Sequence, residues 1–159
     1  MVLILLLVFL AADNQPQSNS WHGIIPLRST RADVEKLLGS PTPESKALDA
    51  AFYRTENERV FVLYSNGPCD VRAGNYWNVP LGTVITFSVY PNVKPKFTNL
   101  KLDESKYKKK EDPEVLDLVY YTSEEEGVSI EVNISEGVVN AIRYSPASRD
   151  NCLRCHVPS

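Results

Sequence analysis

The stretch GVSIEVNISEGVVNAIRYS (residues 127–145) decides the fold of this chain, because apolar and polar side chains alternate along it with a period of two. One face of its first half carries four aliphatic side chains: Val128, Ile130, Val132 and Ile134. The opposite face carries Ser129, Glu131, Asn133 and Ser135. Such alternation predicts a half-buried β-strand, and the Ser-Glu-Gly turn at 135–137 predicts that an antiparallel partner follows.

The same period recurs along most of the chain. The predicted strands are AFYRT (51–55), ERVFVLYS (58–65), GTVITFSVY (82–90), VLDLVYYT (115–122), GVSIEVNIS (127–135) and GVVNAIRYS (137–145). They predict an antiparallel sheet of about six strands with one apolar and one polar face. The interval 93–114 is rich in charge, and its lysine run at 108–110 is followed by acidic residues, so we interpret it mainly as a solvated loop.

A helix is expected before the first strand, within RSTRADVEKLLGSP (28–41). Thr30 and Asp33 have the spacing of a capping box, and Gly39 followed by Pro41 predicts the end of the helix. The residues between them form one apolar stripe: Val34, Leu37 and Leu38. We therefore expect an α+β fold in which this N-terminal amphipathic helix packs on the apolar face of the sheet.

Length and charge limit the choice of function. The 159 residues are enough for one domain, and the net charge of −3 argues against a nucleic-acid partner. The sequence contains no phosphate-binding glycine loop, no nucleophile beside a usable histidine and no paired carboxylates on one element. A metal site is not expected either. The sequence therefore favours a binding role over catalysis.

The N-terminus predicts export. Residues 1–12 contain the uninterrupted apolar run VLILLLVFL followed by two alanines, which is typical of a secretory signal peptide and too short to span a membrane, which takes about 20 residues. A basic n-region is missing, so either the α-amino group supplies the charge or the true start lies upstream. We interpret residues 13–20 as a linker, 21–146 as the folded domain and 147–159 as a C-terminal tail. The mature chain, without an integral membrane span, is expected in the periplasm or outside the cell.

Three cysteines allow three kinds of chemistry at the C-terminus: a disulfide, haem attachment, and a metal-binding or redox-active C-x-x-C at 152–155, where zinc would need carboxylates or Cys69 as further ligands. In the first, Cys69 forms a disulfide with Cys155 or Cys152 and ties the tail to the domain. In the second, the C-x-x-C-H pattern at 152–156 attaches a c-type haem, with thioethers at Cys152 and Cys155 and His156 as the proximal ligand. Only three residues follow His156, too few to build the apolar pocket that a haem needs. We therefore favour the disulfide and a chain without cofactor, and keep a cytochrome-like electron carrier as the alternative.

The segment GIIPLRSTRADVEKLLGSP (23–41) resembles the G-x-T-x-x-D-V-x-x-L-L-G-x-P helix of the small lipoprotein of the outer-membrane β-barrel assembly machinery and of β-lactamase-inhibitor-protein-like domains. The matching residues are Ser29, Thr30, Asp33, Val34, Leu37, Leu38, Gly39 and Pro41. Leu27 and Arg28 stand where that family has Gly, and the lipid-attachment Cys is absent. The resemblance implies a helix followed by antiparallel strands.

A second resemblance covers more of the chain. Exported bacterial proteins of unknown function share the patterns PLxSTRxDVExLLG, YSxGPC and LRC, found here at 26–39, 64–69 and 153–155. Because GPC and LRC are the shared elements, this resemblance implies a disulfide between Cys69 and Cys155 and a free Cys152.

Two surfaces are predicted to bind a partner. Tyr76 and Trp77 lie in the loop NYWNVP (75–80), and exposed loop aromatics are often used for recognition. The polar face of the sheet is the second surface, where we expect Arg54 and Arg143 to pair with Glu58 or Glu131. The expected partner is another protein of the cell envelope or the extracellular space.

Overall fold

The computed structural model of the chain describes residues 19–43 and 49–156. The predicted signal peptide and residues 13–18 of the predicted linker lie outside this range. The strands are β1 (Ala50–Arg54), β2 (Glu58–Tyr64), β3 (Val84–Pro91), β4 (Lys108–Glu111), β5 (Leu118–Ser123), β6 (Val128–Asn133) and β7 (Val138–Tyr144). The helices are α1 (Arg31–Leu38) and the short 3-10 turns η2 (Val71–Ala73), η3 (Phe97–Leu100), η4 (Glu104–Lys106) and η5 (Ser148–Leu153).

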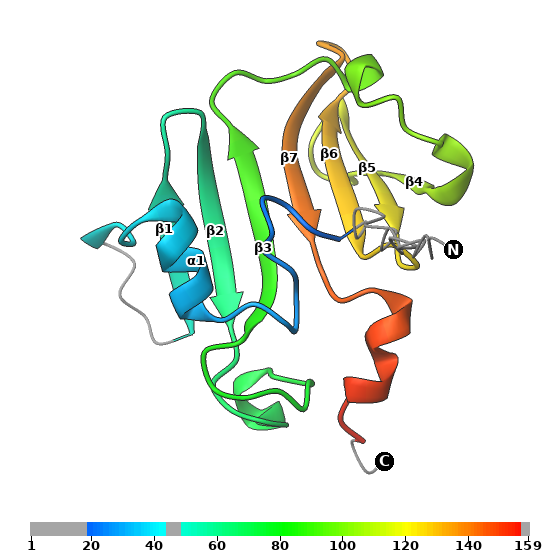
Figure 1. Cartoon of the computed structure of the whole chain (residues 1–159). Coiled ribbons are helices and arrows are strands. Elements are labelled where there is room, and N and C mark those ends of the chain that lie inside the picture. The colour runs from blue at the N-terminus through cyan, green and yellow to red at the C-terminus, as the bar shows by residue number, and fades with distance from the viewer. Residues whose placement is uncertain (1–18, 44–48, 157–159) are drawn as a thin grey trace, which may run out of the picture.

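The strands form one antiparallel sheet with the order β1-β2-β3-β7-β6-β5-β4 (Figure 1). Strands that are neighbours in the sheet are also consecutive in the sequence, with one exception: β3 pairs with β7. This junction joins an N-terminal hairpin region to a C-terminal meander. Phe87 of β3 and Tyr144 of β7 lie opposite each other there, with ring centroids 4.7 Å apart in a stacked arrangement.

The predicted fold class was wrong in two respects. The sheet has seven strands, because Lys108–Glu111 forms β4 inside the interval interpreted as a loop. The helix has eight residues and buries only Val34 fully, while Leu37 is 51% exposed. A helix this short cannot cover a seven-stranded sheet, so the domain is mainly β rather than a helix layered on a sheet.

Irregular segments cover much of the apolar face instead. Ile24, which is fully buried, and Trp21 reach it from the segment before α1, which crosses in front of the sheet in Figure 1. Four side chains of the 97–107 connection pack against the same core: Phe97, Leu100, Leu102 and Tyr107. The ring of Phe97 lies 4.6 Å from that of Tyr121, between centroids.

The local signals at α1 were predicted correctly. The Asp33 carboxylate accepts a hydrogen bond from the Thr30 backbone N–H (2.8 Å), and the Thr30 hydroxyl oxygen accepts one from the Asp33 N–H (3.3 Å). The hydrogen bonds that the Asp33 carboxylate accepts from the Thr30 N–H and from the Thr30 hydroxyl (2.7 Å) hold the pKa of Asp33 below its usual value. The helix ends at Gly39, whose φ of 82° lies in the region that favours glycine.

The six predicted strands all form, with ends shifted by a few residues. Val128, Ile130 and Val132 are buried as expected, but β6 ends at Asn133 and Ile134 is 46% exposed. The apolar face is built from cross-strand pairs such as Val62 with Phe87 and Ile130 with Ile142.

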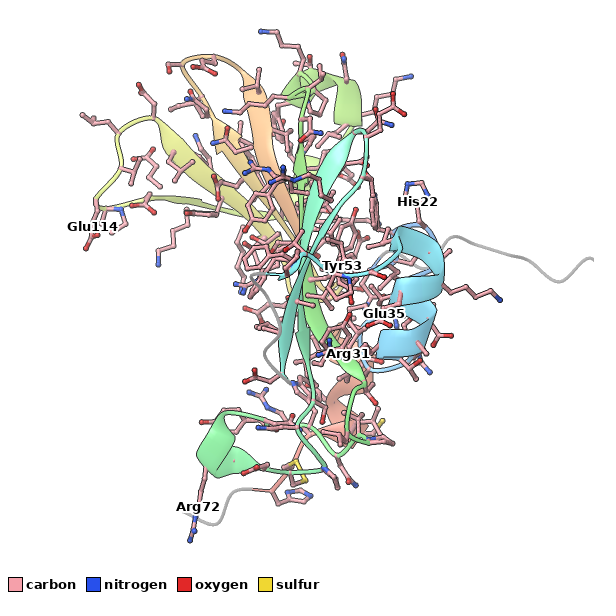
Figure 2. All side chains as sticks on the ribbon, turned by 90° about the vertical axis from the view of Figure 1, so that its left-hand side faces the viewer. His22, Arg31, Glu35, Tyr53, Arg72 and Glu114 are labelled. Carbon is pink, nitrogen blue, oxygen red and sulfur yellow. A yellow bond between two sulfur atoms is a disulfide. The ribbon has the colours of Figure 1, made fainter. Side chains whose placement is uncertain are left out.

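A buried tyrosine pair lies beneath α1. The hydroxyl oxygens of Tyr53 and Tyr64 are 2.7 Å apart, and the Arg31 guanidinium lies 4.1 Å from the centre of the Tyr64 ring. Figure 2 shows Arg31 and Glu35 on the same side of the sheet as Tyr53. Burial raises the pKa of both tyrosines, so their phenols stay neutral in the folded protein.

Within residues 19–43 and 49–156, no helix combines the length and hydropathy that crossing a membrane requires.

Candidate functional site

A disulfide ties the C-terminal tail to the loop that carries Trp77. Cys69 and Cys155, 86 residues apart in sequence, have Cα atoms 5.6 Å apart and are covalently joined. This is the pairing that the second resemblance implied. Cys152 carries an exposed free thiol.

Backbone hydrogen bonds extend this connection on both sides of Trp77. The Cys155 N–H donates to the Tyr76 carbonyl (2.9 Å), and the Asn78 N–H donates to the Leu153 carbonyl (2.8 Å). Trp77 and Arg154 form an isolated antiparallel bridge between them. The tail therefore lies against the loop as a very short strand pair, which we call the clasp.

Asn75 holds the loop in place from inside. It is 6% exposed, and its side-chain amide donates to the Ser65 hydroxyl (2.9 Å) and to the Gly67 carbonyl. Its side-chain oxygen accepts a hydrogen bond from the Trp77 N–H (2.9 Å). Trp77 is thus positioned by the loop itself as well as by the tail.

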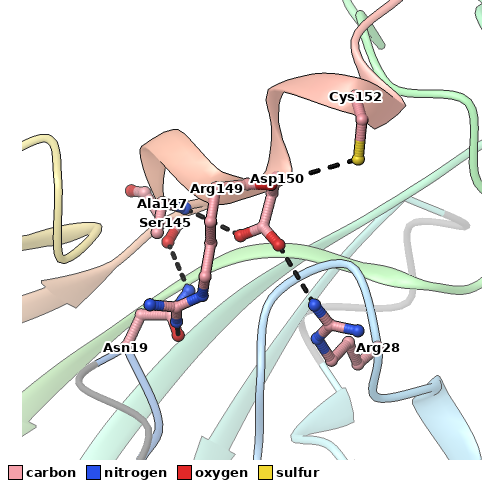
Figure 3. Close-up of polar contacts among 7 residues, drawn as sticks. All are labelled: Asn19, Arg28, Ser145, Ala147, Arg149, Asp150 and Cys152. Atoms are coloured by element: carbon pink, nitrogen blue, oxygen red, sulfur yellow. Dashed lines mark hydrogen bonds and ion pairs between the residues drawn. The ribbon is translucent and has the colours of Figure 1, made fainter.

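The tail is also held against the N-terminal part of the domain (Figure 3). Asp150, whose side chain is 3% exposed, accepts hydrogen bonds from the Ala147 N–H (2.9 Å) and from Arg28 (3.3 Å). Arg149 donates to the Asn19 side-chain oxygen, and the Asn19 amide donates to the Ser145 carbonyl (3.1 Å). Two residues of the N-terminal segment, Arg28 and Asn19, therefore hold η5 in position.

A pocket of about 350 Å³ opens between the clasp and the end of the sheet. Trp77 and Arg154 line one side, and hydroxyl-bearing residues of β5 and β6 line another, among them Thr122 and Ser129. Arg154 lies 5.9 Å from the Trp77 ring centre. An aromatic ring, a guanidinium and several hydroxyls can bind a polar group that also presents a flat apolar surface.

Gly127 shapes the far wall of this pocket. A Cβ atom at this position would lie 2.3 Å from the Ser145 carbonyl oxygen, and the residue has φ +66°. The Ser145 N–H donates to the Gly127 carbonyl (2.7 Å). The close approach of these two backbones requires glycine here.

A second hollow, about 320 Å³ in volume, lies on the polar face of the sheet, which we call the open face. Its sides are aromatic, with Phe61 and Tyr90 on β2 and β3 and Tyr120 on β5, and its floor includes Ser88 and Ala141. We call this hollow the trough. Ser129 lines both the trough and the Trp77 pocket, so the two hollows adjoin.

The predicted binding residues differ in their positions. Trp77 lines the pocket, whereas Tyr76 is 46% exposed and is not among the lining residues. The expected pairing of Arg54 and Arg143 with Glu58 or Glu131 was wrong, because no ion pair in the described part of the chain joins them. Glu131 accepts instead from the Asn140 amide (3.2 Å), and Glu58 accepts from the Thr55 hydroxyl (3.1 Å).

The haem alternative and the disulfide compete for the same atom. A thioether at Cys155 needs the sulfur that bonds to Cys69 in this structure. Cys152 and His156 are both exposed. Haem attachment therefore stays a prediction of the C-x-x-C-H pattern that requires the disulfide to be absent.

Sequence reasoning missed several residues of these hollows. Arg154 and Asn151 line the Trp77 pocket only because the tail folds back, which the disulfide pattern could have suggested. In the described residues, no group of three or more His, Cys, Asp or Glu side chains is arranged to hold a metal ion. No protein-family model, curated protein or solved structure matches the chain.

Proposed function

We propose that this chain is an exported, non-catalytic binding module of the cell envelope that captures a partner protein at the Trp77 pocket. The observation that carries this proposal is the placement of Trp77 beside Arg154 in a pocket next to the clasp, whose two segments a disulfide joins. Tryptophan and arginine are the residues most often responsible for binding energy at protein interfaces.

The disulfide also supports the proposed location. Disulfides persist in oxidising compartments such as the periplasm and the extracellular space, and are rare in the cytosol.

The clasp supports a binding role through preorganisation. The backbone of Trp77 is held by the Asn75 side chain and by the paired tail, so little backbone freedom remains to be lost on binding. A loop that is ordered before the partner arrives contributes more net affinity than a mobile one.

The test is capture from an envelope extract with the mature chain as bait, followed by affinity measurement with the purified partner. Trp77→Ala and Arg154→Ala should each weaken binding at least about tenfold, as expected for central interface residues. Tyr76→Ala should have a smaller effect because its side chain lies outside the pocket.

Lys36→Ala is the matched control, because Lys36 is exposed on α1 and is not among the residues that line the pocket. It should bind like the unmodified chain. Equal capture by the Trp77→Ala variant and by this control, with both variants folded, would refute the proposal.

A further inference from the structure

The open face of the sheet is basic although the chain as a whole is acidic. The strand registers place one unbroken row of side chains across all seven strands: Phe52, Phe61, Ser88, Arg143, Ser129, Thr122 and Lys108. The adjoining row on the same face includes Arg54, Arg59, Tyr90, Glu131, Tyr120 and Lys110. These two rows contain five basic side chains and one acidic side chain, while the net charge of the whole chain is −3.

Within the described residues, the arginines of this face have no acidic partner. Arg54, Arg59 and Arg143 form no ion pair with any described residue, and Arg59 instead lies 5.9 Å from the ring centre of Tyr90. Between them the trough offers aromatic sides formed by Phe61, Tyr90 and Tyr120. A ligand that is complementary to this face would place an aliphatic side chain in the trough and carboxylates beside the arginines.

The same chain presents that chemistry on the turn between β4 and β5. Leu116 is 93% exposed and Val115 is 52% exposed. Four acidic residues flank them: Glu111, Asp112, Glu114 and Asp117. We call residues 111–117 the acidic tip.

The acidic tip is held in a defined conformation. The Asp112 carboxylate accepts from the N–H groups of Glu114 (2.9 Å) and Val115 (3.0 Å), and its other oxygen accepts from the Tyr120 hydroxyl (3.3 Å). The Ile134 N–H donates to the Asp117 carbonyl (2.8 Å). A rigid turn that holds two aliphatic side chains outward is preorganised for docking.

The acidic tip and the trough lie on the same side of the molecule. Figure 2 shows Glu114 projecting on the side of the sheet opposite His22, Arg31 and Glu35, which is the side of the open face. Tyr120 belongs to both features, since it lines the trough and bonds to Asp112. Because the acidic tip and the trough are neighbours on one face, two copies related by a two-fold axis can each place their tip in the trough of the other.

We propose that the open face is a self-association surface. The acidic tip of one copy seats Leu116 in the trough of a second copy, its carboxylates pair with the arginines of that face, and the second copy does the same in return. This inference goes beyond the proposed function, because the partner pocket at Trp77 is a different hollow. The reciprocal contact closes the assembly at two copies.

The test measures mass against concentration by sedimentation equilibrium on the mature chain with its disulfide intact. The unmodified chain should pass from one copy to two as concentration rises. Arg143→Glu and Glu114→Arg should each weaken the pair at least about tenfold, because each places like charges together in both contacts. Leu116→Ser should weaken it as well, and at 93% exposure it should leave the fold unchanged.

Mixing the two charge variants gives the decisive measurement. In a pair of one Arg143→Glu chain and one Glu114→Arg chain, one contact is unmodified and the other has its charges exchanged, so both attract. The mixture should therefore form dimers at concentrations at which each variant alone remains a monomer. A single-copy mass at every concentration, or pairs that neither substitution affects, would overturn the proposal.

Trp77→Ala distinguishes this proposal from the proposed function. It should leave the mass distribution unchanged while it weakens partner capture at least about tenfold. A chain that captures its partner but never pairs would refute only the self-association. If the chain forms dimers but the Trp77→Ala variant captures the partner as well as the unmodified chain does, only the partner pocket would be refuted.

Discussion

Arg154 and Trp77 face each other across the clasp, with the guanidinium carbon 5.9 Å from the ring centre and the two backbones paired in an antiparallel bridge. One residue belongs to the tail and the other to a loop that precedes it by more than 70 positions. The disulfide between Cys69 and Cys155 lies directly beside this contact. Residues of the tail, the loop and the sheet together line the pocket.

Removing the disulfide should lower stability and open the pocket. Cys69→Ser in a Cys152→Ser background releases a loop closed across 86 residues, which should reduce the free energy of unfolding by about 2–4 kcal/mol. Urea unfolding followed by tryptophan fluorescence measures both effects, since Trp77 should become more exposed. The Cys152→Ser chain alone is the control and should match the unmodified protein, because that thiol is exposed.

Thiol counting separates the disulfide from the haem alternative. With Cys69 and Cys155 bonded and Cys152 free, the folded chain should accept one thiol label before reduction and three after it. Intact mass spectrometry of the protein from the exported compartment reads both states. A haem-sized increment that survives reduction, with Soret absorbance, would contradict the disulfide.

Asp150 should contribute to stability mainly through its hydrogen bond within η5. Asp150→Ala leaves the Ala147 N–H buried without an acceptor, which should cost about 1–3 kcal/mol. Arg28→Ala removes only the ion pair, and because the Arg28 side chain is 54% exposed the loss should be at most about 1 kcal/mol. Chemical denaturation of both variants gives the comparison. Equal losses would show that the ion pair is the stronger of the two contacts.

The buried tyrosines should make the protein sensitive to alkali. Burial raises the pKa of Tyr53 and Tyr64 above the ordinary value of 10.0, so above that pH the unfolded chain loses phenolic protons that the folded chain keeps. The free energy of unfolding should be unaffected by these groups below pH 10 and should fall as the pH rises beyond it. Melting temperatures measured from about pH 8 to about pH 11 test this.

A double variant isolates this pair. Tyr53→Phe with Tyr64→Phe removes both titrating phenols together with the hydrogen bond between them, so neither hydroxyl is left without a partner. Its melting temperature should decline less steeply above pH 10. An identical decline would assign the alkaline sensitivity to other groups, such as Tyr107, whose pKa burial raises to about 12.

Gly127→Ala should damage the fold at the far wall of the pocket. The added Cβ would meet the Ser145 carbonyl oxygen at 2.3 Å, so the two backbones must separate and lose their hydrogen bond. We expect a loss of about 1–3 kcal/mol, measured by thermal unfolding. Gly137→Ala is the matched control, with a similar φ of +64° and no atom within 4 Å of the new Cβ. It should lose clearly less stability.

The period-two pattern predicted six strands because each of them has one buried and one solvated face. It could not predict β4, because Lys108–Glu111 is exposed on both faces and its side chains show no alternation. The helix stripe was predicted as a covering layer, but a helix of eight residues reaches little of the sheet. Trp21, Phe97 and Tyr107 cover the apolar face from irregular segments whose spacing has no period to detect.

The candidate site was predictable only where a single segment carries it. Trp77 could be proposed from its loop because it needs no distant residue to be recognised. The trough could not, because Phe61, Ser88 and Arg143 become neighbours only through the registers of β2 with β3 and of β3 with β7. The second of these pairings joins two strands that are separated by 46 residues of the chain, from Asn92 to Gly137.

The lysines of β4 have a consequence for how this protein behaves at high concentration. A strand at the margin of a sheet exposes backbone groups that can recruit strands of other molecules, which leads to aggregation. Consecutive positive charges at Lys108, Lys109 and Lys110 repel the same strand of any other copy that approaches side by side. Replacing them with apolar residues would therefore turn a protected margin into a template for fibril growth.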